Sequence, residues 1–193
     1  MCWPQHCSAL LHCWDCVVSS GSDHVGTGWL TVGASFTKVA SGLGSDNPIE
    51  RLSSAALLRR FFDPKSQYGM RNTPFASDAT KLAAGVLKTE PTGPVQKILA
   101  DGLAESPLLE GADLQKVNLR NAYWGKRKNK NQTPVHAPSA DFFHADLSSA
   151  SFRHAFLPHA VFYGAQLVGT VFENADLTEC IFRSANLRAA KLA

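Results

Sequence analysis

The sequence has no long apolar run and little charge. No stretch of eighteen or more apolar residues occurs among its 193 residues, and the N-terminus lacks the basic start and clean apolar core of a secretory signal. Charged residues make up only 18% of the chain and the formal net charge is +3, so overall charge gives no argument for a nucleic-acid or anionic-membrane partner. These absences predict a cytoplasmic protein that makes no contact with a membrane.

Fingerprints of catalysis and of cofactor binding are also lacking. The chain contains no G-x-S-x-G, H-E-x-x-H, Walker or dinucleotide-binding motif. We therefore expect a protein that is not an enzyme and that holds no cofactor.

Cysteine is scarce outside the first sixteen residues. Four of the five cysteines lie there and Cys180 is far away, and this odd total argues against a fully paired set of disulfides and favours a reducing compartment. His6 and His12 accompany the N-terminal cysteines, which makes them candidate zinc ligands, although only one C-x2-C pair is present where a zinc site typically has two. The four candidates are Cys2, Cys7, Cys13 and Cys16.

The composition divides the chain into three parts. Residues 1–34 are rich in Cys, Trp, Gly and Ser and show no sustained period, so we expect a poorly structured extension. Residues 35–106 show short stretches of helical spacing separated by Pro and Gly, which predicts an α-helical domain. Residues 107–193 follow a different, five-residue period.

The helical part contains clear start signals. Asn47 is a good N-cap, Pro48 suits the first helical position and Glu50 places a negative charge near the positive helix end. The apolar residues that then recur at helical spacing are Ile49, Leu52, Ala56, Leu57 and Phe61. Further helices are expected after a cap at Ser77-Asp78 and after the break that ends at Pro94. In pattern, residues 36–105 resemble the HEAT-like helical segments that precede pentapeptide repeats in some bacterial proteins, which suggests either a cap on the next domain or a separate peptide-binding surface.

The C-terminal part repeats every five residues without an exception over eleven positions. A large apolar residue occupies each position, and a small residue, usually Ala, lies two places before it. The large residues are Phe142, Leu147, Phe152, Leu157, Phe162, Leu167, Phe172, Leu177, Phe182, Leu187 and Leu192. Segments such as Ala145-Asp146-Leu147-Ser148-Ser149 resemble the A(D/N)LXX unit of pentapeptide-repeat proteins, and the resemblance extends to earlier units from about Pro107.

The resemblance implies a right-handed quadrilateral parallel β-helix, in which four pentapeptides make one square coil of twenty residues. With the helical N-terminal domain the chain is α+β overall. In such a coil the large and small residues would point inward, so the eleven large residues would form structural ladders rather than a binding site. Cys180, at a small position, is then a small hydrophobe, and His144, His154 and His159 fall on three different sides.

The five-residue register breaks once, between Trp124 and Phe142. These residues are eighteen apart, so we expect a loop insertion at residues 126–138. The loop is basic, and its four cations are the candidate partner contacts: Lys126, Arg127, Lys128 and Lys130. Since the loop has no aromatic residue on which bases could stack, nucleic acid is possible but not indicated.

The sequence thus favours a non-enzymatic binding or scaffold protein, with another protein as its partner. One alternative is a protein that protects topoisomerase or DNA, because some members of the family resemble DNA in shape and negative charge. From Pro107 onward, however, ten Lys and Arg outnumber seven Asp and Glu, whereas a DNA mimic needs an acidic rod. The second alternative is a zinc-dependent protein that uses the N-terminal cysteines. We also expect a possible homodimer through the C-terminal coil, since the unpaired backbone groups at an open coil edge can pair with a second chain.

Overall fold

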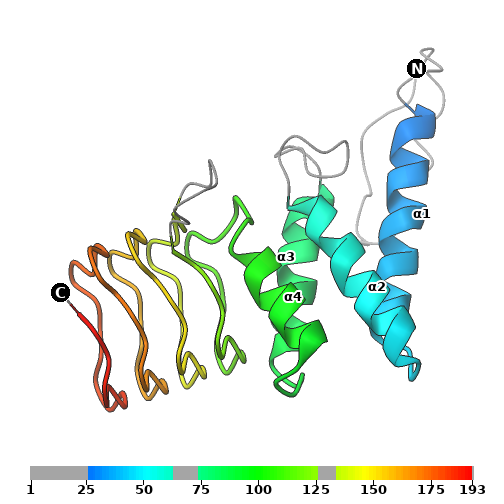
Figure 1. Cartoon of the computed structure of the whole chain (residues 1–193). Helices are drawn as coiled ribbons and strands as arrows, with labels where there is room; N and C mark the ends of the chain where they lie inside the picture. The colour runs from blue at the N-terminus through cyan, green and yellow to red at the C-terminus, as the bar shows by residue number, and fades with distance from the viewer. Residues whose placement is uncertain (1–25, 63–73, 126–133, 193) are drawn as a thin grey trace, which may run out of the picture.

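The computed structural model describes residues 26–62, 74–125 and 134–192. Its helices are α1 (Gly26–Leu43), α2 (Pro48–Leu58), a 3-10 turn η1 (Arg59–Phe61), α3 (Pro74–Leu87) and α4 (Pro94–Leu103). After α4 the chain winds into a stack of coils that extends away from the helices to the C-terminus (Figure 1). None of the described helices combines the length and the hydropathy needed to span a bilayer.

The start of α2 confirms the expected cap. The side chain of Asn47 accepts a hydrogen bond of 2.9 Å from the backbone N–H of Ile49, and Pro48 occupies the first helical position. Two boundaries differ from the expectation. Helix α1 begins at Gly26, inside the segment expected to be poorly structured, and α3 begins at Pro74, before the predicted cap at Ser77-Asp78. Helix α1 extends through residues with no strong local start signal, because packing against neighbouring helices outweighs weak propensity. Helix α3 has Pro74 at its first position, where proline is favoured.

Helix α1 packs on α2, α2 packs on α4, and α4 also packs on α3. Their shared core contains Leu58, Phe62, Leu87, Leu99 and Leu103, each almost fully buried. Burial of each such side chain contributes about 1.5–3 kcal/mol. The core is therefore built mainly from the inner side of α2 and from the last turns of α3 and α4.

Most of the apolar stripe that the sequence singled out does not face this core, although its last member, Phe61, is buried in it. Ile49, Leu52 and Leu57 are 76%, 36% and 42% exposed. The buried side of the helix carries Ala55 and Leu58 instead. Helix α2 is therefore apolar on two sides, of which the described chain covers one.

The coils are held together by parallel pairing between residues twenty apart. Asp141 pairs with Val161, which pairs with Ile181, and the same pattern recurs on the other three sides. Each pairing is an isolated bridge, so within 26–62, 74–125 and 134–192 no continuous strand forms. The cause is the corner residue: every fifth residue, such as Ser149 with φ of 58°, takes a left-handed conformation that ends the extended segment. His144, His154 and His159 all occupy such corners.

The large residues of the repeat lie inside the coils and stack along them. The rings of Phe142 and Phe162 are parallel with centroids 5.0 Å apart, and Phe162 and Phe182 continue the stack at 4.9 Å. Phe152 and Phe172 stack in the same way on another side at 5.3 Å. Offset stacking of this kind adds about 0.5–1.5 kcal/mol per pair to the burial of the rings.

The inserted loop is shorter than predicted. Val135 and Ala137 are buried in the tube, and the backbone N–H of Ala137 donates to the carbonyl oxygen of Phe156 at 2.9 Å. His136 forms the matching bridge with Phe156. Residues 134–138 are therefore one side of a coil, and the extra residues are those from 126 to 133, outside the described part. The five-residue pattern is hard to recognise in residues 134–138, because Val occupies the position of the small residue and Ala that of the large one.

Helix α4 and the end of α3 cover the first coil. The side-chain amide of Gln96, a buried residue of α4, donates to the carbonyl oxygens of Asn118 at 3.0 Å and of Arg120 at 3.1 Å. The backbone N–H of Asn118 donates to the carbonyl oxygen of Leu87 at 2.8 Å, and that of Tyr123 donates to Asp101 Oδ1 at 2.8 Å. These contacts satisfy backbone groups that the first coil would otherwise leave unpaired.

Candidate interaction surfaces

The partner contacts and metal ligands expected from the sequence lie outside the described residues. This applies to Cys2, Cys7, Cys13 and Cys16 and to Lys126, Arg127, Lys128 and Lys130. Within the described ranges, no three His, Cys, Asp or Glu side chains gather in a way that could hold a metal ion.

The ladder residues are structural for most of their length. Those from Phe142 to Leu167, together with Phe172, are fully buried, so they present nothing to a ligand. Exposure rises in the last coil, where Phe182 and Leu187 are half-buried and Leu192 is 54% exposed. The chemistry of the solenoid surface therefore comes from the outward positions, of which the repeat favours a residue type, Asp or Asn, only directly before the large residue.

Thr170 and Cys180 occupy small inward positions and make the same hydrogen bond. Thr170 Oγ1 donates to the carbonyl oxygen of Leu147 at 2.8 Å, and Cys180 Sγ donates to that of Leu157 at 3.0 Å. Each acceptor lies twenty-three residues before its donor, so the two bonds are equivalent on two sides. Burial raises the pKa of the Cys180 thiol, and nearby Asp176 raises it further, although a backbone hydrogen bond to Ala160 acts in the opposite direction. Cys180 is thus held as a neutral thiol.

One side of the solenoid is apolar on its outer surface. We call it the aromatic side and define it by the outward residues Phe143, Val161, Tyr163 and Ile181. The rings of Phe143 and Tyr163 are stacked at 5.4 Å with only 10° between their planes. The ring of His144 meets Phe143 edge-on at 4.3 Å, and Ile181 is an exposed large hydrophobe. Four apolar side chains thus lie together on adjacent coils.

A glycine makes room for part of this side. Gly164 has a φ of +64°, and a Cβ atom added there would come within 2.6 Å of the His144 ring. A residue with a side chain would therefore displace the imidazole. Since His144 also contacts Phe143 and Tyr163, Gly164 helps to fix the arrangement of the three rings.

The other three sides are polar or carry paired charges. Asn186 Nδ2 donates to Gln166 Oε1 at 3.0 Å, and Arg153 pairs with Glu173 at 2.5 Å. On the remaining side His159 Nδ1 lies 3.1 Å from Glu179 Oε2, although this side also carries a stacked pair formed by His136 and Phe156. Among the described residues, the aromatic side differs from the rest in having three adjacent rings, Phe143, His144 and Tyr163, beside the aliphatic pair of Val161 and Ile181.

Sequence reasoning missed the aromatic side. The signal was present, because Phe143 and Tyr163 are twenty residues apart at the same outward position, as are Val161 and Ile181. Reading the outward positions in steps of twenty would have found it.

Comparisons with known proteins match the repeat region. The family model described as pentapeptide repeats matches residues 140–178 and 159–192, with eight copies. A comparison with curated proteins gave no match. A match to this family implies a right-handed β-helical solenoid, and proteins of the family are generally non-catalytic and often mediate protein interactions.

Solved structures of pentapeptide repeat proteins are similar to part of this chain. HetL, involved in heterocyst differentiation regulation in the cyanobacterium Nostoc sp. strain PCC 7120, is 31% identical over 42% of this chain and 36% of its own, with a TM-score of 0.27. A protein from the Arabidopsis thaliana thylakoid lumen is 22% identical over 43% of this chain and 66% of its own, with a TM-score of 0.32. Rfr23 from the cyanobacterium Cyanothece 51142 is 18% identical over 42% of this chain and 84% of its own, with a TM-score of 0.25.

This chain therefore covers only about a third of HetL. The eight matched repeats, together with coils that pair every twenty residues and turn a corner every five, identify residues 140–192 as pentapeptide repeats.

Proposed function

We propose that this chain is a non-enzymatic scaffold that binds another protein through the aromatic side of its solenoid. The observation that carries the proposal is the contiguous set of Phe143, Val161, Tyr163 and Ile181 on successive coils. Outward positions of a half-buried sheet are normally polar, so apolar and aromatic residues there favour a surface that a partner covers.

The rigidity of the surface supports binding. The backbone of Val161 pairs with the coils on both sides, at Asp141 and at Ile181, and that of Ile181 pairs with the preceding coil. A partner would lose little free energy in ordering such a surface, because it is fixed before the partner arrives. Aromatic anchors on a rigid surface are typical of the residues that dominate protein interfaces.

The charges on the aromatic side favour a protein over a nucleic acid. Asp113 and Asp141 lie at the outward positions of its first coils, and Arg183 follows Tyr163 on the last coil. A phosphate backbone would need a run of cations there and would be repelled by the two carboxylates. A protein surface with a basic group at one end, an apolar centre and an acidic group at the other end fits this arrangement.

A pull-down with matched variants tests the proposal. The double variant Tyr163→Arg and Ile181→Glu places charges on the aromatic side, while Gln166→Arg and Asn186→Glu make the same replacements on the neighbouring polar side. A third variant changes Lys126, Arg127, Lys128 and Lys130 to Ser. We expect the aromatic-side variant to lose a protein that the intact chain, the polar-side variant and the loop variant all capture.

Two results would overturn the proposal. One is capture of the same proteins by the intact chain and by the aromatic-side variant. The other is loss of capture only in the loop variant, which would make the basic loop the contact. Equal unfolding temperatures for the three variants would show that differences in capture do not come from unfolding.

A further inference from the structure

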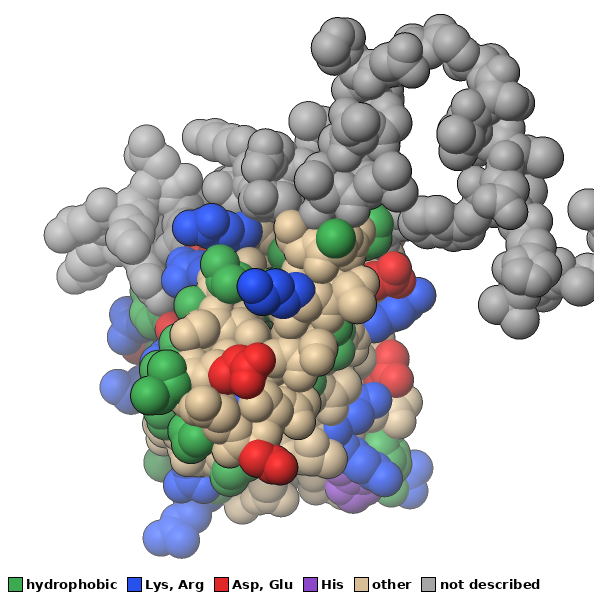
Figure 2. Space-filling model, turned by 90° about the vertical axis from the view of Figure 1, so that its right-hand side faces the viewer, with side chains coloured by type: hydrophobic (Ala, Val, Ile, Leu, Met, Phe, Trp, Pro, Cys, Tyr) green, Lys and Arg blue, Asp and Glu red, His purple; other side chains and the backbone are tan. Residues whose placement is uncertain are grey.

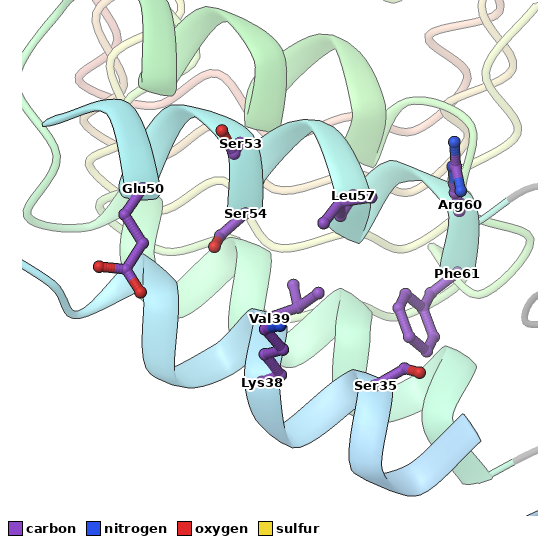
Figure 3. Close-up of a pocket in the computed structure, with 9 residues that line it drawn as sticks. All are labelled: Ser35, Lys38, Val39, Glu50, Ser53, Ser54, Leu57, Arg60 and Phe61. Atoms are coloured by element: carbon purple, nitrogen blue, oxygen red, sulfur yellow. The ribbon is translucent and has the colours of Figure 1, made fainter. Parts of the chain in front are cut away.

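A groove opens between α1 and α2, at the end of the molecule opposite to the C-terminal coil. It has a volume of about 300 Å³. Val39 and Phe61 form its floor and Leu57 one wall, while Lys38, Arg60 and Glu50 stand around the rim (Figure 3). The groove thus combines an apolar interior with charged groups at its edge.

The outer face of α2 extends the apolar surface beyond the groove. Because successive residues of a helix are about 100° apart, Ile49 lies about 80° around the helix from Leu57 and borders the groove, whereas Leu52 lies about 140° from Leu57 and points away from it. All three side chains are substantially exposed. Viewed towards this end of the molecule, hydrophobic side chains lie at the surface beside Lys and Arg side chains (Figure 2). In solenoids the terminal element normally presents a polar outer face, so this exposed apolar stripe is unusual.

The cations of the rim are not paired. Lys38 and Arg60 are exposed and form no ion pair with any described residue, whereas Arg51 and Arg59 pair with Glu90 and Glu105 on the inner edge of the domain. Glu50, at the other end of the groove, accepts a hydrogen bond from Ser45 Oγ at 2.7 Å near the start of α2. The end of the groove between Lys38 and Arg60 therefore attracts anionic groups.

We infer that this groove binds an amphipathic helix of a partner protein, whose apolar residues enter the groove and whose carboxylates meet Lys38 and Arg60. Two adjacent helices leave a groove into which the side chains of a third can pack. Helix α2 has eleven residues and is therefore about 16 Å long, which matches about three turns of a bound helix. Complementary charge selects an acidic helix over a basic one. This site is independent of the aromatic side and would give the scaffold a second point of attachment.

Two labelled peptides provide the test. Both are synthetic helices of about eighteen residues with Leu at positions i, i+3, i+4 and i+7, and they differ only in carrying Glu or Lys beside the apolar stripe. Binding to the full chain is followed by fluorescence anisotropy. We expect the Glu peptide to bind at least about tenfold more tightly than the Lys peptide, a ratio that corresponds to about 1.4 kcal/mol.

Charge reversal then locates the site. The variant Lys38→Glu with Arg60→Glu should invert the preference between the two peptides. The variant Lys81→Glu with Arg188→Glu makes the same change in net charge at exposed cations away from the groove and should leave the preference unchanged. The variant Leu57→Ser should weaken the binding of both peptides. Circular dichroism checks that each variant keeps its helices.

Three results would overturn the inference: no binding of the Glu peptide by the intact chain, equal binding of the two peptides, or equal loss in the groove and control variants. The aromatic-side variant Tyr163→Arg with Ile181→Glu should bind the Glu peptide like the intact chain. The experiments can therefore disprove peptide binding in the groove and protein binding on the aromatic side independently of each other.

Discussion

The indole N–H of Trp124 donates a hydrogen bond of 2.9 Å to the backbone carbonyl oxygen of Ala100. Trp124 is a buried inward residue of the first coil, and Ala100 lies in the last turns of α4. The same ring packs against Phe142 at 5.8 Å and Phe152 at 5.5 Å, so one side chain joins the helices to the ladders of the solenoid.

Replacing Trp124 by Phe should lower the free energy of unfolding by about 1–3 kcal/mol, because the carbonyl oxygen of Ala100 loses its partner while buried. Urea titration followed by circular dichroism measures the change. The control is Phe156→Leu on the outer surface, which should cost less than about 0.5 kcal/mol. Equal costs for the two variants would show that the bond to Ala100 does not stabilise the junction.

Cys180 should react slowly with thiol reagents. Burial raises its pKa, and the thiol donates to the carbonyl oxygen of Leu157, so little thiolate forms near neutral pH. The measurement uses a chain in which Cys2, Cys7, Cys13 and Cys16 are Ser, and follows alkylation at about pH 8. A matched chain with Cys180→Ala and Arg183→Cys places a thiol at an exposed position of the same coil. We expect the thiol at position 183 to react at least about tenfold faster; similar rates would contradict the burial of Cys180.

Replacing Gly125 and Gly85 by Ala should change the stability of the protein in opposite directions. A Cβ atom on Gly125 would lie 2.8 Å from the backbone nitrogen of Arg153 and 2.9 Å from its carbonyl oxygen. The backbone has to shift, so Gly125→Ala should destabilise the protein by about 1–3 kcal/mol. A Cβ atom on Gly85, in α3, meets no atom within 4 Å, so Gly85→Ala should stabilise the protein by about 0.5–1 kcal/mol. Thermal unfolding of both variants, compared with the intact chain, tests whether stability falls for the first variant and rises for the second.

The contact between Asp113 and the helices should depend on pH. The backbone N–H of Gln115 lowers the pKa of Asp113 from its ordinary value of 3.8, and the ammonium group of Lys88, 3.2 Å away, lowers it further. A carboxyl whose pKa is lower in the folded state stabilises that state above its ordinary pKa and loses this effect as pH falls through the folded value.

The variant Asp113→Asn should therefore be less stable than the intact chain near neutral pH. The difference should be under about 1 kcal/mol, because Asp113 is largely exposed and water screens the interaction. Urea titrations across the acid range should show the difference shrinking below about pH 4. A difference that stays constant down to about pH 2 would show that the charge of Asp113 is not the cause.

The sequence predicts the inward positions well because they obey two constraints at once, size and register. Phe142 and Phe162 occupy equivalent positions in successive coils, so their stacking follows from the spacing alone. The same constraints concealed residues 134–138, where Val135 and Ala137 exchange the usual sizes and still fill the tube. A scan for large residues cannot recognise a side on which the volumes are exchanged.

The helical part shows a different limit. The spacing of Ile49, Leu52 and Leu57 correctly indicates a helix but does not reveal which side of it is buried. That choice depends on which neighbours are available: α2 contacts α1 and α4, and its buried residues include Ala55 and Leu58. The groove beside Leu57 depends on how α1 and α2 pack, so the sequence pattern of α2 alone does not predict it.

The left-handed corner at every fifth residue restricts how the length of this chain can change. Insertion of twenty residues would add one full coil and return each downstream side chain to its original side. Insertion of five would rotate all downstream residues by a quarter of a coil, place Leu over Phe in the ladders and move Tyr163 away from Phe143. Whole coils are thus the natural unit by which such a protein can lengthen or shorten and keep its binding side continuous.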